Sequence, residues 1–141
     1  MPKVVIDANV IVSAMFGGTP RKAFLKALRT CDMYYSPEIN LELIGLLDEL
    51  EDKLNRTKIR RLRSIILNLL SISKEVTTSK KIELSRDKKE NAYLNLCLRV
   101  RADFLLTGDK DLLEIPPKKL KPLGLNRLKI VSPDVFLSES K

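Results

Sequence analysis

Apolar residues recur along the chain in two alternating patterns, and these patterns predict the order of its elements. Four segments carry apolar side chains at helical spacing and are predicted to be amphipathic helices, at residues 20–30, 37–50, 57–70 and about 88–101. A short β-branched run typical of a buried strand lies at residues 3–6, and further short strand-like runs lie at residues 33–35, 75–77, 104–107 and 128–131. Strands that alternate with helices predict βαβ units and a mostly parallel sheet.

Two of these predicted helices, at 20–30 and 37–50, begin at a hydroxyl residue followed by proline, and a third pair of this kind predicts one more helix, which starts at residue 133. The pairs are Thr19 with Pro20, Ser36 with Pro37, and Ser132 with Pro133. The hydroxyl is expected to cap the free amides, and proline loses nothing at the first helical position because its missing N–H would have been unpaired. In the second of these helices, Leu41 and Ile44 lie away from the main apolar side and are expected to belong either to the core or to a dimer interface.

Length and composition favour one globular domain over residues 1–141. Apolar residues make up 44% of the chain, which is enough for a core, and no apolar run approaches the length of a membrane span. The first residues have no signal-peptide layout. We therefore expect a soluble, cytoplasmic protein without a membrane partner. Cys31 and Cys97 have no metal-binding spacing and are expected to be small buried apolar residues.

Charge and the lack of histidine narrow the chemistry. The chain has 26 basic and 18 acidic residues and no histidine, so its net charge is +8. Sites that need a histidine base, nucleophile partner or zinc ligand are therefore excluded. The basic residues cluster at 53–63 and 116–131, two segments without an acid. Such surfaces attract polyanions, although a plain solvated surface has the same composition.

Several acids stand where surface acids are not expected. Asp7 directly follows the strand at 3–6, and Asp109 follows the strand at 104–107, with Asp111 just beyond. In an open parallel sheet, ligands bind at the carboxyl ends of the strands. Glu42 and Glu90 fall at the border between the apolar and the solvent side of their helices.

Each acid also has a purely structural interpretation. Asp7 and Asp109 fit as caps of helices that start at the next residue, and Asp87 with Glu90 has the form of a capping box. Glu42 fits a surface pair with a lysine. Taken together, however, carboxylates gathered at one sheet edge would repel one another, and a hard cation such as Mg²⁺ or Mn²⁺ removes that conflict.

Four blocks of the sequence resemble the motifs of PIN-domain nucleases. Residues 5–14 read V-x-D-x-N-V-x-x-S-A, the second block pairs Ser36 and Pro37 with Glu42, the third is residues 86–91, and the fourth is residues 102–113. The blocks occur in family order and span most of the chain. The resemblance implies a three-layer α/β/α domain with a mostly parallel, twisted sheet. It also implies a metal-dependent ribonuclease, often the VapC-like toxin partner of a small antitoxin.

Carried over by position, the resemblance implies an acidic quartet with a supporting set. The quartet is Asp7, Glu42, Glu90 and Asp109, and the supporting residues are Asn9, Thr107 and Asp111. The third block of the family usually has aspartate where this chain has Glu90, so either Glu90 or Asp87 is expected to be the third metal ligand.

The expected reaction is hydrolysis of RNA phosphodiesters with one or two Mg²⁺ or Mn²⁺ ions, and Ser13 and Thr107 are expected to orient the carboxylates. The expected partners are RNA, an antitoxin and a second copy of the chain. Two other functions stay open. One is phosphoryl transfer to Asp7, although Asn9 stands where a second aspartate is usual; the other is RNA binding without catalysis.

Overall fold

The computed structural model describes residues 1–79 and 82–139, and in these residues five strands form one parallel sheet. The strands are β1 (Lys3–Ile6), β2 (Asp32–Tyr35), β3 (Lys74–Glu75), β4 (Phe104–Leu106) and β5 (Lys129–Val131). Their order in the sheet is β3-β2-β1-β4-β5, and every neighbouring pair runs parallel. The predicted parallel sheet is therefore confirmed, with the predicted edge strand at 75–77 shifted and shortened.

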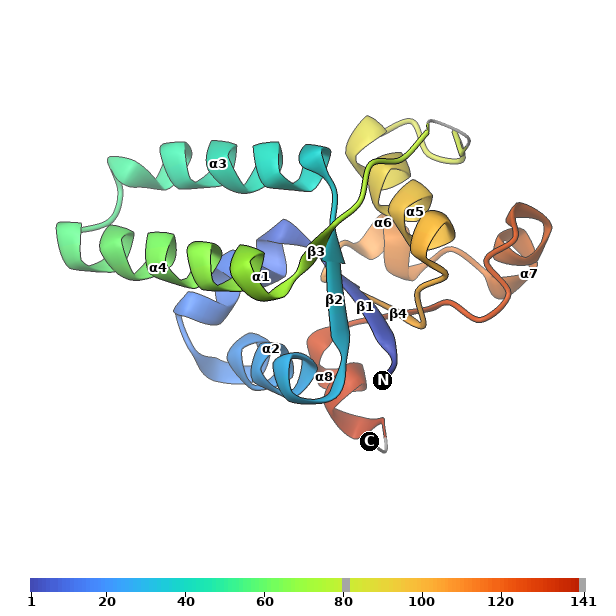
Figure 1. Cartoon of the computed structure of the whole chain (residues 1–141), viewed down its shortest axis with the longest axis horizontal. Helices are drawn as coiled ribbons and strands as arrows, with labels where there is room; N and C mark the ends of the chain where they lie inside the picture. Colours follow the sequence, from blue (N-terminus) through green and yellow to red (C-terminus); the bar gives the residue numbers. More distant parts are fainter. Residues whose placement is uncertain (80–81, 140–141) are drawn as a thin grey trace.

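Helices cover both faces of this sheet. They are α1 (Ala8–Met15), α2 (Gly18–Thr30), α3 (Pro37–Glu51), α4 (Arg56–Ile72), α5 (Lys88–Val100), α6 (Lys110–Leu113), α7 (Pro117–Leu120), the 3₁₀ helix η1 (Lys121–Leu123) and α8 (Pro133–Ser138). Figure 1 shows α1 to α4 and α8 on one side of the sheet and α5 to α7 on the other. The three-layer α/β/α architecture that the resemblance implies is confirmed.

The predicted apolar sides of the helices face the core. In α4 the buried residues are the predicted Ile59, Leu62, Ile66 and Leu69. Helix α5 buries its predicted apolar residues too, but it also buries two polar side chains, Glu90 and Asn95. The side chain of Asn95 accepts from the amide of Ile82 and donates to the carbonyl oxygen of the same residue. A buried polar side chain is stable when it is hydrogen-bonded in this way.

The three predicted hydroxyl caps behave differently. Ser36 caps α3 as predicted, by accepting from the amide of Ile39. The prediction for Thr19 is wrong: α2 begins at Gly18, and its N-cap is Gly17, at φ +91°. The guanidinium of Arg21 donates to the carbonyl oxygens of the last turn of α1, at 2.9 and 2.6 Å, and this contact fixes the turn between the helices.

The third predicted helix start, at Ser132 and Pro133, lies where predicted, but the serine hydroxyl does not cap the helix. Helix α8 begins at Pro133, yet the hydroxyl of Ser132 makes no capping bond to the helix amides. It donates instead to the Asp134 carboxylate at 2.6 Å.

The two apolar residues that were expected in either the core or a dimer interface lie at the surface. Leu41 and Ile44 on α3 are 67% and 47% exposed, so the core interpretation is wrong. Both cysteines are buried and free, as expected of small apolar residues. Among the described residues, no helix combines the length and apolar character that crossing a membrane requires.

Helix α4 offers a matched test of this core. Leu62 is fully buried and Leu67 is 67% exposed, although both lie in the same helix. We expect Leu62→Ala to lower the free energy of unfolding by about 2–5 kcal/mol, because it leaves a cavity. Leu67→Ala should stay within about 0.5 kcal/mol of the wild type. Urea denaturation followed by circular dichroism measures both, and equal losses would contradict this packing of α4.

Candidate active site

The centre of the site is Asp7, which follows β1 at the carboxyl edge of the sheet. Its amide donates to the carbonyl oxygen of Leu106 at 2.9 Å, so the residue is held by the neighbouring strand β4. Its side chain is buried, with 4% exposed. The hydroxyl of Thr107, which follows β4, donates to Asp7 Oδ2 at 2.6 Å. The parallel pairing of β1 and β4 therefore brings the ends of two distant segments into direct contact.

The structural interpretation of Asp7 is confirmed, and it is compatible with a functional role. Its Oδ1 accepts from the amide of Asn9 at 2.9 Å and caps α1. Because each carboxylate oxygen accepts more than one hydrogen bond, capping does not use up the acceptor capacity of the group. The cap fixes the carboxylate in place while one edge of it faces a cavity.

Tyr93 of α5 links two of the predicted acids. Its hydroxyl lies 2.6 Å from Glu42 Oε1 on α3 and 3.4 Å from Asp7 Oδ1, and it accepts from the amide of Ala8 at 2.9 Å. Burial, followed by the charges of Asp7 and Glu42, raises the pKa of Tyr93, so the phenol keeps its proton as a donor. The expected surface pair of Glu42 with a lysine is therefore wrong, since its short contact is with Tyr93.

A second group of carboxylates lies beside Asp7. Oxygens of Glu90, Asp109 and Asp111 all lie within 4.8 Å of one another. Glu90 is buried, and its Oε1 accepts from the hydroxyl of Ser85. The side chain of Asp109 caps α6 by accepting from the amide of Asp111 at 2.9 Å, and its own amide donates to the Thr107 hydroxyl at 3.0 Å. Thr107 thus contacts both Asp7 and Asp109.

The four acids of the predicted quartet line one small cavity of about 180 Å³. Asn9, Asp87, Lys89 and Tyr93 complete its lining. A neighbouring cavity of about 420 Å³ shares Asp7, Asn9 and Asp109, and it extends to Ser13 and Gly108. The structure therefore brings the whole quartet together with Asn9 and Thr107.

The remaining predicted residues lie at the margin of the site. Asp87 is exposed and caps α5 by accepting from the amide of Lys89, so the predicted capping box with Glu90 is wrong. Asp111 is exposed and belongs to the carboxylate group without lining the small cavity. Ser13 is exposed at the larger cavity, and within the described residues its hydroxyl makes no hydrogen bond to a carboxylate.

The carboxylates are short of positive partners. Within residues 1–79 and 82–139, no lysine or arginine lies within 4 Å of a carboxylate oxygen of the quartet. Burial raises the pKa of Glu42, and the charge of Asp7 raises it further, although Tyr93 and Lys89 oppose the shift. Burial and contact with Asp109 raise the pKa of Glu90. A set of oxygen donors with surplus negative charge suits a hard divalent cation.

These shifts give a pH dependence of stability. A carboxyl with a raised pKa in the folded state favours folding when protonated, and this contribution is lost as pH rises through that pKa. In metal-free protein, Glu42→Gln should therefore raise the melting temperature near neutral pH. The difference should vanish as pH falls to the ordinary carboxyl pKa of about 4.3. Differential scanning fluorimetry in EDTA, from neutral pH down to about pH 4.3, measures the difference in melting temperature between the two proteins. A difference that does not change with pH would contradict the raised pKa of Glu42.

Comparison with known proteins agrees with this geometry. The family model described as PIN domain matches residues 3–111. No curated protein matches the sequence. The fold is similar to a chain in the crystal structure of VapBC2 from Rickettsia felis bound to a DNA fragment from their promoter, with a TM-score of 0.55 and 12% identity over 91% of this chain and 98% of that chain. Since the family model covers most of the sequence, the chain belongs to the PIN domain family.

Proposed function

We propose that the protein is a metal-dependent endoribonuclease that hydrolyses RNA phosphodiesters. The observation that supports this most strongly is the convergence of Asp7, Glu42, Glu90 and Asp109, from four separate parts of the chain, on one small cavity without a basic partner within ion-pair distance in the described residues. Bringing like charges together costs free energy, and binding a divalent cation offsets that cost.

The chain's own residues divide the work. Asp7 and Asp109 would hold a Mg²⁺ or Mn²⁺ ion, and Glu42 and Glu90 would complete the set of oxygen donors, with Asp111 beside them. When bound, such an ion activates a water for attack on phosphorus and stabilises the leaving oxygen. Thr107 and Tyr93 hold the carboxylates in position through their hydroxyls, at 2.6 Å from Asp7 and from Glu42. Asn9 and Ser13 line the adjoining cavity, where the substrate backbone would pass.

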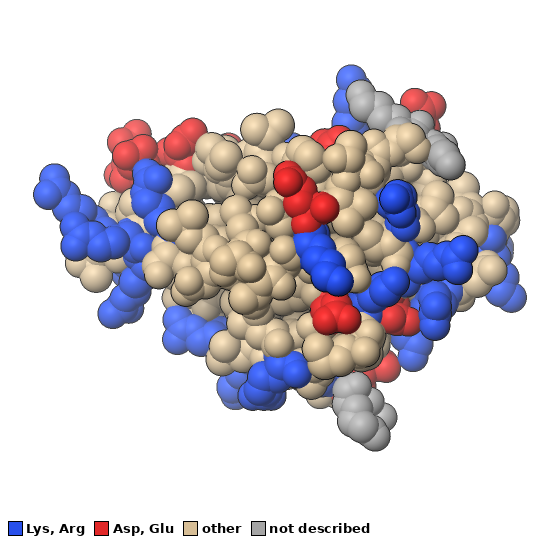
Figure 2. Space-filling model, viewed as in Figure 1, with Lys and Arg blue, Asp and Glu red and all other residues tan. Residues whose placement is uncertain are grey.

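The charge distribution supports RNA as the substrate. An acidic cavity alone would repel a phosphate backbone, but the chain carries a net charge of +8. Figure 2 shows lysine and arginine side chains spread over the side that α5 and α7 occupy, with a second group at the left of the view, where α4 begins. Basic surfaces neutralise phosphates and raise the rate of encounter with a polyanion.

We extend the proposal to the protein's partners. A VapC-like toxin role in a type II toxin–antitoxin pair fits the family and the likeness to a VapBC2 structure, and it requires a small antitoxin protein. Leu41 and Ile44, exposed on α3, offer an apolar surface for a second copy in a homodimer. The cytoplasm is the compartment where a ribonuclease of this kind meets RNA.

Asp7→Asn is the sharpest test of catalysis. Asparagine has nearly the same shape and its carbonyl oxygen still caps α1, so the fold and melting temperature should be close to those of the wild type. Cleavage of a labelled RNA in Mg²⁺ should fall by about 10²- to 10³-fold, because the carboxylate charge that would hold the cation is lost. Asp48→Asn, an exposed acid on α3 outside the site, is the matched control and should cleave normally.

Chelator separates this function from its two rivals. EDTA should abolish cleavage by the wild type, whereas an RNA-binding module without catalysis would give no products in either condition. A phosphoryl-transfer domain that uses Asp7 would form a tight complex with a phosphate-mimicking fluoride and Mg²⁺, which a nuclease would not. Undiminished, metal-dependent cleavage by the Asp7→Asn protein would contradict the proposal.

Metal binding distinguishes Glu90 from Asp87 as the third ligand. Glu90 is buried against Asp109, whereas Asp87 is exposed and engaged as a helix cap, so we assign the role to Glu90. Glu90→Gln should weaken Mn²⁺ binding by roughly 10- to 100-fold in isothermal titration calorimetry, while Asp87→Asn should have a much smaller effect. The opposite ranking would assign the ligand to Asp87.

A further inference from the structure

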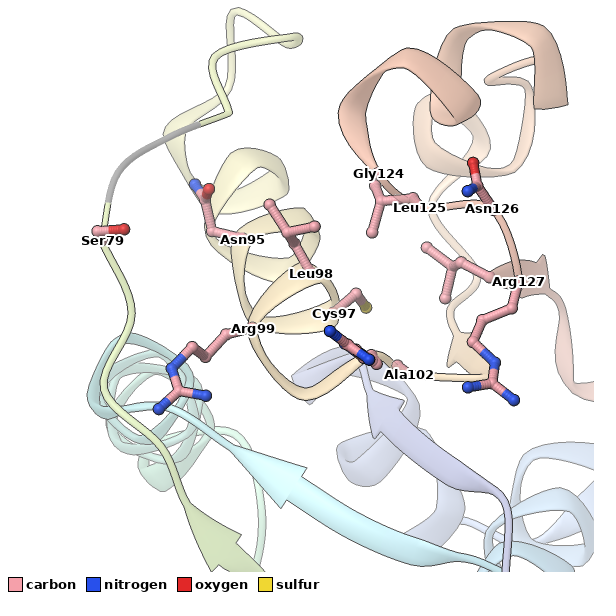
Figure 3. A pocket seen from close by; sticks show the side chains of 12 residues that line it. Ser79, Asn95, Cys97, Leu98, Arg99, Ala102, Gly124, Leu125, Asn126 and Arg127 are labelled. Atoms are coloured by element: carbon pink, nitrogen blue, oxygen red, sulfur yellow. The ribbon is translucent and has the colours of Figure 1, made fainter.

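A further cavity lies away from the carboxylates. It has a volume of about 610 Å³ and lies between the last turns of α5 and the segment 124–128. Its floor is apolar, with Leu98 and Leu125 facing each other across it, as Figure 3 shows. Arg99, Arg101 and Arg127 contribute to its walls, and the figure shows Arg99 and Arg127 at opposite margins. We call this cavity the arginine pocket.

The arginine pocket is distinct from the acidic site, although α5 connects them. Glu90 is in the first turn of α5, and Arg101 follows its last residue. Eleven residues of helix correspond to about 16 Å along the axis. No residue lines both this pocket and either of the two cavities around Asp7.

The guanidinium groups carry a surplus of positive charge. Arg99 and Arg101 are exposed, and neither has an ion-pair partner within the described part of the chain. Arg127 is 3.3 Å from Asp103 Oδ1, which leaves most of its side chain exposed. The other oxygen of Asp103 accepts from the amide of Lys3 at 2.8 Å. Within the described residues, Arg127 is therefore the one arginine of this pocket that has a carboxylate within ion-pair distance.

Two backbone conformations shape the pocket. Arg101 ends α5 in the left-handed region, at φ +58°, where glycine is the usual residue, and it is the only non-glycine residue with positive φ among residues 1–79 and 82–139. Gly124 lies on the opposite wall at φ +86°, and a Cβ there would come within 3.1 Å of Leu98 Cδ1. The walls thus approach closely at Gly124, and an arginine occupies a position that glycine would fill with less strain.

We infer that the arginine pocket binds a single-stranded segment of RNA. Its guanidinium groups contact backbone phosphates at the two margins, and a base lies on the apolar floor between them. A volume of about 610 Å³ falls in the usual range for ligand pockets and has room for a nucleotide. Lys118, Lys119 and Lys121 precede Gly124 in the chain and are exposed. The choice of RNA rests on the proposed function, but binding at this pocket requires neither metal nor cleavage.

Arg101→Gly tests the inference. The experiment uses the full chain with Asp7→Asn, in EDTA, and follows anisotropy of a labelled single-stranded RNA. We expect Arg101→Gly to weaken binding by roughly tenfold or more, as loss of a charged hydrogen-bond donor does. The melting temperature should be unchanged or higher, because glycine relieves the left-handed backbone. Arg101→Lys should restore only part of the affinity, since it keeps the charge without the planar fork.

Arg29→Ala is the matched control, because it removes one exposed arginine from α2, on the other side of the sheet and outside both basic groups named above. If Arg29→Ala and Arg101→Gly weaken binding equally, diffuse surface charge explains the affinity and the pocket assignment is overturned. Binding of adenosine monophosphate that depends on Arg101, together with RNA affinity that does not, would assign the pocket to a free nucleotide and also overturn the inference. Because cleavage is not measured, failure of the nuclease proposal gives a different result from failure of this one.

Discussion

The hydrogen bond from Thr107 to Asp7 joins the ends of β1 and β4, and the rest of the site is arranged around it. Without a partner, a carboxylate that is 4% exposed would be too costly to keep ionised. The sheet supplies that partner from a strand a hundred residues away in sequence. The same Thr107 hydroxyl accepts from the amide of Asp109, so one side chain fixes two of the acids.

Helix capping and catalysis are often treated as competing explanations of an acid, but in this site they are compatible. Asp7, Asp87 and Asp109 are all N-caps, and all three also line the acidic cavity together with Glu42 and Glu90. A capping bond holds the carboxylate by one oxygen and leaves further lone pairs free. A rigid carboxylate loses less conformational entropy when it binds an ion, so the structural role assists the proposed chemical role.

Features that depend on residues close together in the sequence could be predicted, and features that depend on distant residues could not. The order of strands and helices could be predicted from apolar spacing, and Asp7 and Asp109 from their positions after strands. Tyr93 was missed because its apolar ring places it on the buried side of α5, while its hydroxyl acts on residues of α1 and α3. The predicted start of α2 is wrong because the chain turns at Gly17, and the contacts of Arg21 with the last turn of α1 hold that turn. The arginine pocket combines segments that no local pattern connects.

The shared hydroxyl of Tyr93 has a consequence for how the acids behave as a set. One proton faces two carboxylates, at 2.6 Å from Glu42 and 3.4 Å from Asp7, so the bond to one acid weakens when the bond to the other strengthens. Substitutions at these two positions are therefore energetically coupled, and their effects do not add. A change in the hydrogen bonding or charge of Glu42 therefore alters the hydrogen bond to Asp7, and the reverse, because both carboxylates share the hydroxyl of Tyr93.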